Sequence, residues 1–293
     1  MTANGYCVLN QRTLFRLEGG DRVRYLNGQV SNDVTKSTTT SAIQACVLTA
    51  KGKLCAVIWI WATQDGLFIE AAPSLRESLQ ARLERYIIAD DVTLIHDSDR
   101  LHLIHVLNPE FSEGIDVSRF GSPGKDLWVA PGDVAKTVEK LEEQGLKALS
   151  PELRELCRIS NGVPYWEAEL DENTLPQEAR LENTAVDFHK GCYVGQEVVS
   201  RIKSVGRVNR RLTGFEAESP LAAGMILAAE ANPETPLGAI TSVSPVFGLS
   251  KWIGMGYVKH GFDISDARLL AIDPQKGSPT SVRVREFPID IVI

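Results

Sequence analysis

Residues 187–201 read DFHKGCYVGQEVVSR, and this stretch fits neither a buried strand nor an ordinary surface helix. A buried segment would carry apolar residues in place of the polar run Gly195-Gln196-Glu197. A surface helix would avoid two glycines four residues apart, because glycine weakens helices. The sequence therefore predicts a glycine-containing turn, followed by a helix that begins near Gln196.

Cys192 lies within this turn, beside groups that can make a thiol reactive. Lys190 can stabilise a thiolate by its charge, and the N-terminus of the next helix would add a partial positive charge. The alternative is an inert buried cysteine, and the residues alone leave both interpretations open. Glu197 also has two interpretations: its carboxylate can bind the edge of a guanidine-like heterocycle, or it can serve the helix dipole from the first turn.

The bulk composition predicts a globular chain of two or three domains. It has 293 residues, of which 43% are hydrophobic and 24% are charged, so disordered, collagen-like and membrane classes are not indicated. The first ten residues, MTANGYCVLN, lack the basic and apolar regions of a signal peptide, and no apolar run has the length of a membrane span. We therefore expect a cytoplasmic protein that does not bind membranes.

The charge balance argues against a stable nucleic-acid partner. The formal net charge is −7, whereas proteins that bind nucleic acids usually carry a basic surface. A local exception is SRIKSVGRVNRR, residues 200–211, with five lysines and arginines. This run is typical of a solvated strand face, and the alternatives are a contact with phosphate or polyglutamate and, as a weaker hypothesis, an RNA-binding module.

The cysteines predict neither disulfides nor a metal site formed by this chain alone. They are odd in number and scattered along the sequence: Cys7, Cys46, Cys55, Cys157 and Cys192. No pair has the spacing of a zinc site, and the sequence also lacks the motifs of nucleotide-binding loops, zinc proteases and serine hydrolases.

The order of the expected elements favours an α+β fold. Strands and helices alternate irregularly, without a repeated βαβ unit. Beyond Arg207 the helical pattern stops, and short strand-like runs separated by Gly, Pro and Asp predict a terminal β-barrel or sandwich. Before Arg207, the main elements that the sequence predicts are a strand at 13–17, a helix from Asp21, three strands in 41–73 and helices in 74–86 and 133–145.

The segment KGCYVGQE, residues 190–197, resembles the signature K-G-C-Y-x-G-Q-E of the YgfZ family. These are folate-binding proteins of iron–sulfur cluster biogenesis, related in fold to the glycine-cleavage T-protein, an aminomethyltransferase. The resemblance covers essentially the whole chain. It includes GGDRVRYLNGQVSNDV (19–34, with Asn27 in place of the usual Gln), AKGKLCAVIWIW (50–61) and LCRISNGVPYW (156–166).

The fold that this resemblance implies is a three-domain ring with a C-terminal β-barrel. Residues 1–46 and 145–205 would form a discontinuous folate-binding first domain, and residues 47–144 a ferredoxin-like second domain. Residues 206–293 would form the barrel. The turn that holds Cys192 would face a central folate cavity.

The function that the resemblance implies is that of an accessory factor. It would bind tetrahydrofolate and support the assembly, transfer or repair of iron–sulfur clusters in client enzymes, including tRNA-thiolating enzymes. Cys192, with Lys190 beside it, would contact a transient cluster, and a partner must complete the site because one cysteine cannot supply four thiolates. We expect a monomer that contacts client enzymes and assembly proteins transiently. The candidates for folate contact are Asn32, Asp33, Glu182, Tyr193, Gln196 and Glu197.

Two alternatives remain for these residues and for the activity. Asn32, Asp33 and Glu182 are equally typical of turns and caps. A folate-dependent aminomethyl or methyl transferase, or a demethylase, would also need a folate cavity. T-proteins carry catalytic aspartates in the strand after KGK, but residues 54–58 read LCAVI and contain no carboxylate to move protons at the folate nitrogen. The resemblance therefore leaves enzymatic activity open and does not predict the T-protein reaction.

Overall fold

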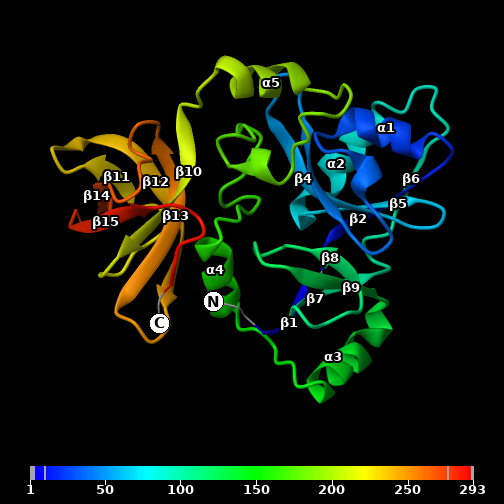
Figure 1. The fold of residues 1–293 in the computed structure, drawn as a ribbon, viewed down its shortest axis with the longest axis horizontal. Coiled ribbons are helices and arrows are strands. Elements are labelled where there is room, and N and C mark those ends of the chain that lie inside the picture. The colour runs from blue at the N-terminus through cyan, green and yellow to red at the C-terminus, as the bar shows by residue number, and fades with distance from the viewer. Residues whose placement is uncertain (1–3, 10, 276, 292–293) are drawn as a thin grey trace.

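A computed structural model describes residues 4–9, 11–275 and 277–291 of the chain. It contains two open antiparallel sheets and a closed barrel. Figure 1 shows the barrel on one side and the two open sheets on the other, with the chain that follows helix α4 between them. This arrangement confirms the expected α+β fold with a C-terminal barrel.

The first sheet has five antiparallel strands in the order β3-β4-β5-β2-β6. Helices α1 and α2 share one hydrophobic core with it, and Tyr25 of α1 donates a hydrogen bond to the carbonyl of Leu83 in α2. The elements are β2 (Thr13–Glu18), α1 (Arg22–Gln29), β3 (Ile43–Leu48), β4 (Leu54–Ala62), β5 (Leu67–Ala71), α2 (Arg76–Glu84) and β6 (Thr93–His96). The expected strand at 13–17, the three-strand run and both helices are thus confirmed.

The second sheet has four antiparallel strands in the order β1-β7-β9-β8. Helix α3 packs on it through Val138 and Leu141, which contact Tyr6 and Ile104 in a separate hydrophobic cluster. Its elements are β1 (Gly5–Leu9), β7 (His102–Leu107), β8 (Ile115–Val117), β9 (Gly124–Val129) and α3 (Val134–Glu143). Short 3₁₀ helices lie at Val34–Lys36, Pro73–Leu75, Pro131–Asp133 and Leu181–Asn183.

The boundary expected between residues 46 and 47 does not follow these sheets. It falls inside β3, and β2 pairs with both β5 and β6, so residues 13–96 form one sheet. Strand β1, which the expected first domain would include, instead pairs with β7 in the second sheet. The reason is the strand pairing: β3, β4 and β5 pair as consecutive strands, and β2, which precedes them in the chain, pairs along the other edge of β5. The division into three domains otherwise stays a prediction.

The barrel closes through six antiparallel strands in the order β10-β13-β12-β11-β14-β15. Its interior is apolar, with Phe215, Leu227, Val258 and Val282 all buried. Closure removes the unpaired edges that an open sheet of short strands would expose. The strands are β10 (Arg210–Ala217), β11 (Ile226–Ala229), β12 (Asn232–Val246), β13 (Lys251–Lys259), β14 (Arg268–Ile272) and β15 (Pro279–Arg285).

Helix α4 (Pro151–Ser160) joins the barrel to the rest of the chain through a buried ion pair. Its apolar residues pack on barrel residues, and Arg158, only 2% exposed, points to the same side. Arg158 donates to Glu169 at 2.9 Å and to Ser242 of β12 at 2.6 Å. Glu169 also accepts from the hydroxyl of Thr241 at 2.7 Å. One pair of charges thus fixes α4, the segment at 161–170 and β12 together.

Replacing Arg158 by methionine should therefore destabilise the whole protein. The change leaves Glu169 as a buried carboxylate without its counter-charge, so we expect the free energy of unfolding to fall by about 3–5 kcal/mol. Chemical denaturation followed by circular dichroism measures this. The matched control is Glu155→Gln, because Glu155 is the exposed partner of Arg158 and should cost less than about 1 kcal/mol. Equal losses in the two variants would contradict this account.

Candidate functional site

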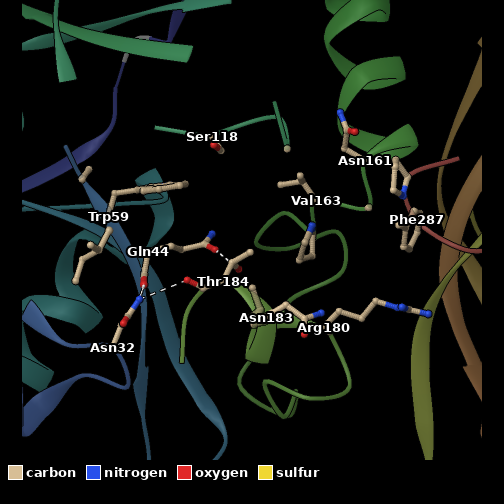
Figure 2. Close-up of a pocket in the computed structure, with 18 residues that line it drawn as sticks. Asn32, Gln44, Trp59, Ser118, Asn161, Val163, Arg180, Asn183, Thr184 and Phe287 are labelled. Carbon is tan, nitrogen blue, oxygen red and sulfur yellow. Dashed lines mark hydrogen bonds between the residues drawn. The ribbon is translucent and has the colours of Figure 1, made fainter. Parts of the chain in front are cut away.

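A central cavity of about 660 Å³ lies between the first sheet, the loop after β8, the segment after α4 and the chain that follows β15. Figure 2 shows Trp59 and Gln44, from the first sheet, on one side of it, with Asn161 and Phe287 across from them. Gly162 lies directly under Phe287 with a positive φ of 68°, and an added Cβ would come within 2.3 Å of the ring. The wall therefore depends on chain segments from both ends of the sequence.

The polar groups in this cavity are mostly neutral amides held by other residues. Asn32 donates to the carbonyl of Gln44 at 2.8 Å, and the side-chain oxygen of Gln44 accepts from Thr184 at 2.7 Å. Asn161 donates to the carbonyl of Phe120 at 2.8 Å. Within the described residues, this leaves the amide nitrogen of Gln44 and the amide oxygen of Asn161 free to bind a ligand.

Arg180 is the one ionisable side chain among the 18 residues that line the cavity in the described structure. It adopts a left-handed φ of 61°, and its Nε donates to the carbonyl of Leu212 at 2.7 Å. Burial lowers the pKa of Arg180, and the nearby positive charge of Arg211 lowers it further. An arginine remains charged at neutral pH even so. The cavity can thus bind a flat polar molecule with an anionic group, but among the residues that the structure describes its lining includes no general acid or base for proton transfer.

The turn that holds Cys192 docks on the end of β3. Helix α5 (Gln196–Val205) begins where the sequence predicted, directly after Gly195. Gly195 has a φ of 88°, and an added Cβ would lie 2.6 Å from the carbonyl oxygen of Thr49. Only glycine satisfies both the left-handed backbone and the close approach. The structure therefore explains why the second glycine of KGCYVGQE, Gly195, has to be a glycine.

Lys190 anchors the other side of this turn to the segment after α1. Its ammonium donates to the backbone carbonyls of Asn27, Val30 and Asn32 at 2.7, 2.7 and 2.8 Å. Burial lowers the pKa of Lys190 to about 8, so the group is still mostly protonated at neutral pH. The ammonium group of Lys190 thus donates to three backbone carbonyls, and no hydrogen bond joins Lys190 to Cys192 within the described residues. The stabilisation of a thiolate at Cys192 by Lys190 therefore stays a prediction.

Cys192 is exposed, unlike the other cysteines. Cys7, Cys46 and Cys157 are buried, Cys55 is half-buried, and all five are free thiols. Burial raises the pKa of Cys7 to about 11 and that of Cys46 to about 12. The interpretation of Cys192 as a buried inert cysteine is therefore wrong, and Cys192 is the thiol that a partner can reach.

The remaining candidates for folate contact do not converge on one site. Asn32 lines the central cavity, whereas Asp33 beside it caps the 3₁₀ helix at Val34–Lys36 by accepting from Thr35. Tyr193 is buried in a hydrophobic cluster, and its hydroxyl has no hydrogen-bond partner within the described residues.

Glu182, Gln196 and Glu197 also lie outside the central cavity. Glu182 lines a second cavity and pairs with Arg211 at 3.2 Å. Gln196 and Glu197 form the first turn of α5, with Glu197 exposed. The turn with Cys192 therefore does not face the central cavity as expected, because its contacts with β3 and with the end of α1 place it elsewhere.

Four cavity residues were not expected from the sequence: Gln44, Trp59, Asn161 and Arg180. A signal was present for two of them, since Trp59 lies in AKGKLCAVIWIW and Asn161 in LCRISNGVPYW. Nothing in the local pattern of Gln44 or Arg180 indicates a site. No group of three or more His, Cys, Asp or Glu side chains in the described ranges could hold a metal ion. In the same residues, no helix is both long and apolar enough to cross a membrane.

Comparisons with known proteins give relatives in sequence and in fold. No family model matches the sequence. A protein of Phaeosphaeria nodorum named "Iron-sulfur cluster assembly factor IBA57 homolog, mitochondrial" is 26% identical over 282 residues, covering 84% of this chain and 62% of that protein. A protein of Serratia proteamaculans named "tRNA-modifying protein YgfZ" is 29% identical over 252 residues, covering 78% and 75%. The crystal structure of the glycine cleavage system aminomethyltransferase T from Bartonella henselae superposes with a TM-score of 0.85 at 16% identity, covering 98% of this chain and 87% of that chain.

The two glycines of KGCYVGQE should respond differently to alanine. Gly195→Ala forces a left-handed backbone and a contact with Thr49, so we expect a loss of about 3 kcal/mol in the free energy of unfolding. Gly191→Ala is the matched control: an added methyl group there meets nothing within 4 Å, and the change should stay within about 0.5 kcal/mol. Urea denaturation of both variants tests this, and an unaffected Gly195→Ala protein would refute the docking of the turn.

Proposed function

Because the chain belongs to the YgfZ family and has the fold of aminomethyltransferase T, we propose that it is a tetrahydrofolate-binding accessory factor. It supports the assembly, transfer or repair of iron–sulfur clusters in client enzymes, including enzymes that modify tRNA. The observation that carries the proposal is the exposed Cys192 in a turn that is tied, through Lys190, to a residue of the central cavity.

The residues of the central cavity fit a folate. Trp59 and Phe287 offer aromatic surfaces for a flat heterocycle, and the amides of Gln44 and Asn161 have free groups for its polar edge. Arg180 supplies a cation for a carboxylate of the glutamate group. These residues would bind and orient the ligand, and tetrahydrofolate itself would supply the capacity to carry a one-carbon group.

Cys192 would act on a cluster as cargo. Its thiolate can provide one ligand, while the other ligands must come from a partner protein or a small thiol. The exposed position of Cys192 supports this, because such a ligand must be reached from outside. Contacts with client enzymes and assembly proteins are therefore transient, and we propose no stable nucleic-acid partner. A monomeric state and a cytoplasmic location stay predictions.

The competing hypothesis is a folate-dependent transferase or demethylase. It requires a group that moves protons at the reacting nitrogen. The residues lining the central cavity include no Asp, Glu, His, Lys or Cys within the described structure, and β4 carries no carboxylate. This hypothesis also leaves Cys192 without a role, so we favour the accessory factor.

The first test is complementation of a bacterium that lacks its own family member. We expect the wild-type chain to restore an iron–sulfur enzyme and tRNA thiomethylation, and Cys192→Ala to restore neither at equal expression. Cys55→Ala is the control, because that half-buried thiol lies in β4 and packs against the hydrophobic core of the first sheet. If Cys192→Ala works as well as wild type, the thiolate role is wrong. If the well-expressed wild type fails, the transferase hypothesis gains instead.

The second test measures tetrahydrofolate binding by anaerobic titration calorimetry. Gln44→Ala removes a cavity amide and should weaken binding about ten-fold, equivalent to about 1.4 kcal/mol. The exposed Gln275→Ala should have no effect. The wild-type protein should release no methylenetetrahydrofolate when given an aminomethyl donor. Absence of binding would overturn the folate proposal, and product formation would overturn the accessory-factor role.

A further inference from the structure

A second cavity of about 500 Å³ lies between α5 and the start of the barrel. Its lining includes Gln177, Glu182, Lys203, Arg207 and Arg211, and we call it the α5 cavity. Part of its wall is apolar, since Phe188, Ile202 and Val208 also contribute. The site is thus a hollow with defined sides, and part of the basic run at 200–211 lines it.

The α5 cavity is electropositive although the whole chain carries a net charge of −7. It is lined by three cationic side chains and one carboxylate, Glu182, which is paired with Arg211. Lys203 and Arg207 are exposed at the rim and form no ion pair within the described residues, although Nζ of Lys203 lies 3.6 Å from the ring centroid of Phe188. Cations at the rim of a hollow attract an anionic ligand, and salt screens this attraction because they are exposed.

Several polar atoms in this cavity are also without partners. Gln177 is 6% exposed, and its Oε1 has no hydrogen bond within the described residues. The same is true of Nε of Arg211, a buried donor. Oε2 of Glu182 is a third such atom. Buried polar groups of folded proteins are normally satisfied, so the bonding of this wall is incomplete, and water or a shift of the wall on ligand binding would complete it.

The α5 cavity adjoins the central cavity. Asn183 lines both, and the 3₁₀ helix Leu181–Asn183 lies between them. Arg180 belongs to the central cavity and Arg211 to the α5 cavity, and their charges are close enough for Arg211 to lower the pKa of Arg180. Positive charge therefore continues from one cavity to the next, which suits one extended ligand with several anionic groups.

We propose that the α5 cavity binds the γ-linked oligoglutamate tail of a folate whose ring system occupies the central cavity. This inference rests on the proposed folate binding. A tail of this kind repeats a carboxylate at each residue, and carboxylates pair with arginine and lysine side chains such as Arg207 and Lys203. RNA phosphate is disfavoured, since the charge of the whole chain is negative and the cations surround a hollow.

The test compares tetrahydrofolate monoglutamate and triglutamate by anaerobic titration calorimetry at low salt. Wild type should bind the triglutamate about ten-fold more tightly, a difference of about 1.4 kcal/mol. The double variant Lys203→Ala/Arg207→Ala should lose this preference and keep its affinity for the monoglutamate. The matched control is Arg85→Ala/Lys136→Ala, which removes two exposed cations outside both cavities.

The outcomes separate this proposal from the proposed function. Equal affinity of wild type for the two ligands overturns the tail site and leaves folate binding in place. Absence of binding to either ligand overturns folate binding itself. A titration with tRNA adds one further outcome: salt-dependent tRNA binding that the double variant loses, without any preference for triglutamate, would overturn the proposal in favour of a nucleic-acid site.

Discussion

The arrangement of the molecule depends on the ion pair between Arg158 and Glu169. Moving two charges out of water is costly, and their attraction compensates only where hydrogen bonds satisfy the remaining polar atoms. Here Ser242 and Thr241 of the barrel and the backbone of Tyr165 supply those bonds. The pair therefore forms only when α4, the segment after it and β12 are all in place. Because residues 161–164 line the central cavity, the same pair that attaches the barrel also determines the shape of the site.

Local elements could be predicted from the sequence because short-range rules set them. The turn at Gly195 and the start of α5 follow from a glycine in a left-handed conformation before a helix-forming run. The barrel follows from short apolar runs between turn residues. The boundary expected at residues 46 and 47 falls inside β3 for the opposite reason: strand pairing between β2 and β5 joins residues 50 to 58 positions apart, and no local pattern indicates it.

The site was only partly predictable because its contacts also join residues that are far apart in the sequence. Asn32 lines the central cavity, while its contact with a folate stays a prediction, and the segment KGCYVGQE contains the one exposed cysteine. The sequence could not show that the ammonium group of Lys190 donates hydrogen bonds to backbone carbonyls, because those carbonyls lie about 160 residues earlier in the chain. The position of Arg180 in the cavity could not be predicted either, because it depends on a left-handed backbone conformation that arginine seldom adopts.

Asn32 has two contacts that link distant parts of the protein. Its side chain lines the central cavity, while its backbone carbonyl accepts a hydrogen bond from Lys190, two residues before Cys192. A molecule that displaces Asn32 must stretch or break that bond, and the displacement then reaches the loop that carries the thiol. If a ligand shifted Asn32 in this way, filling of the cavity and presentation of Cys192 would be thermodynamically linked.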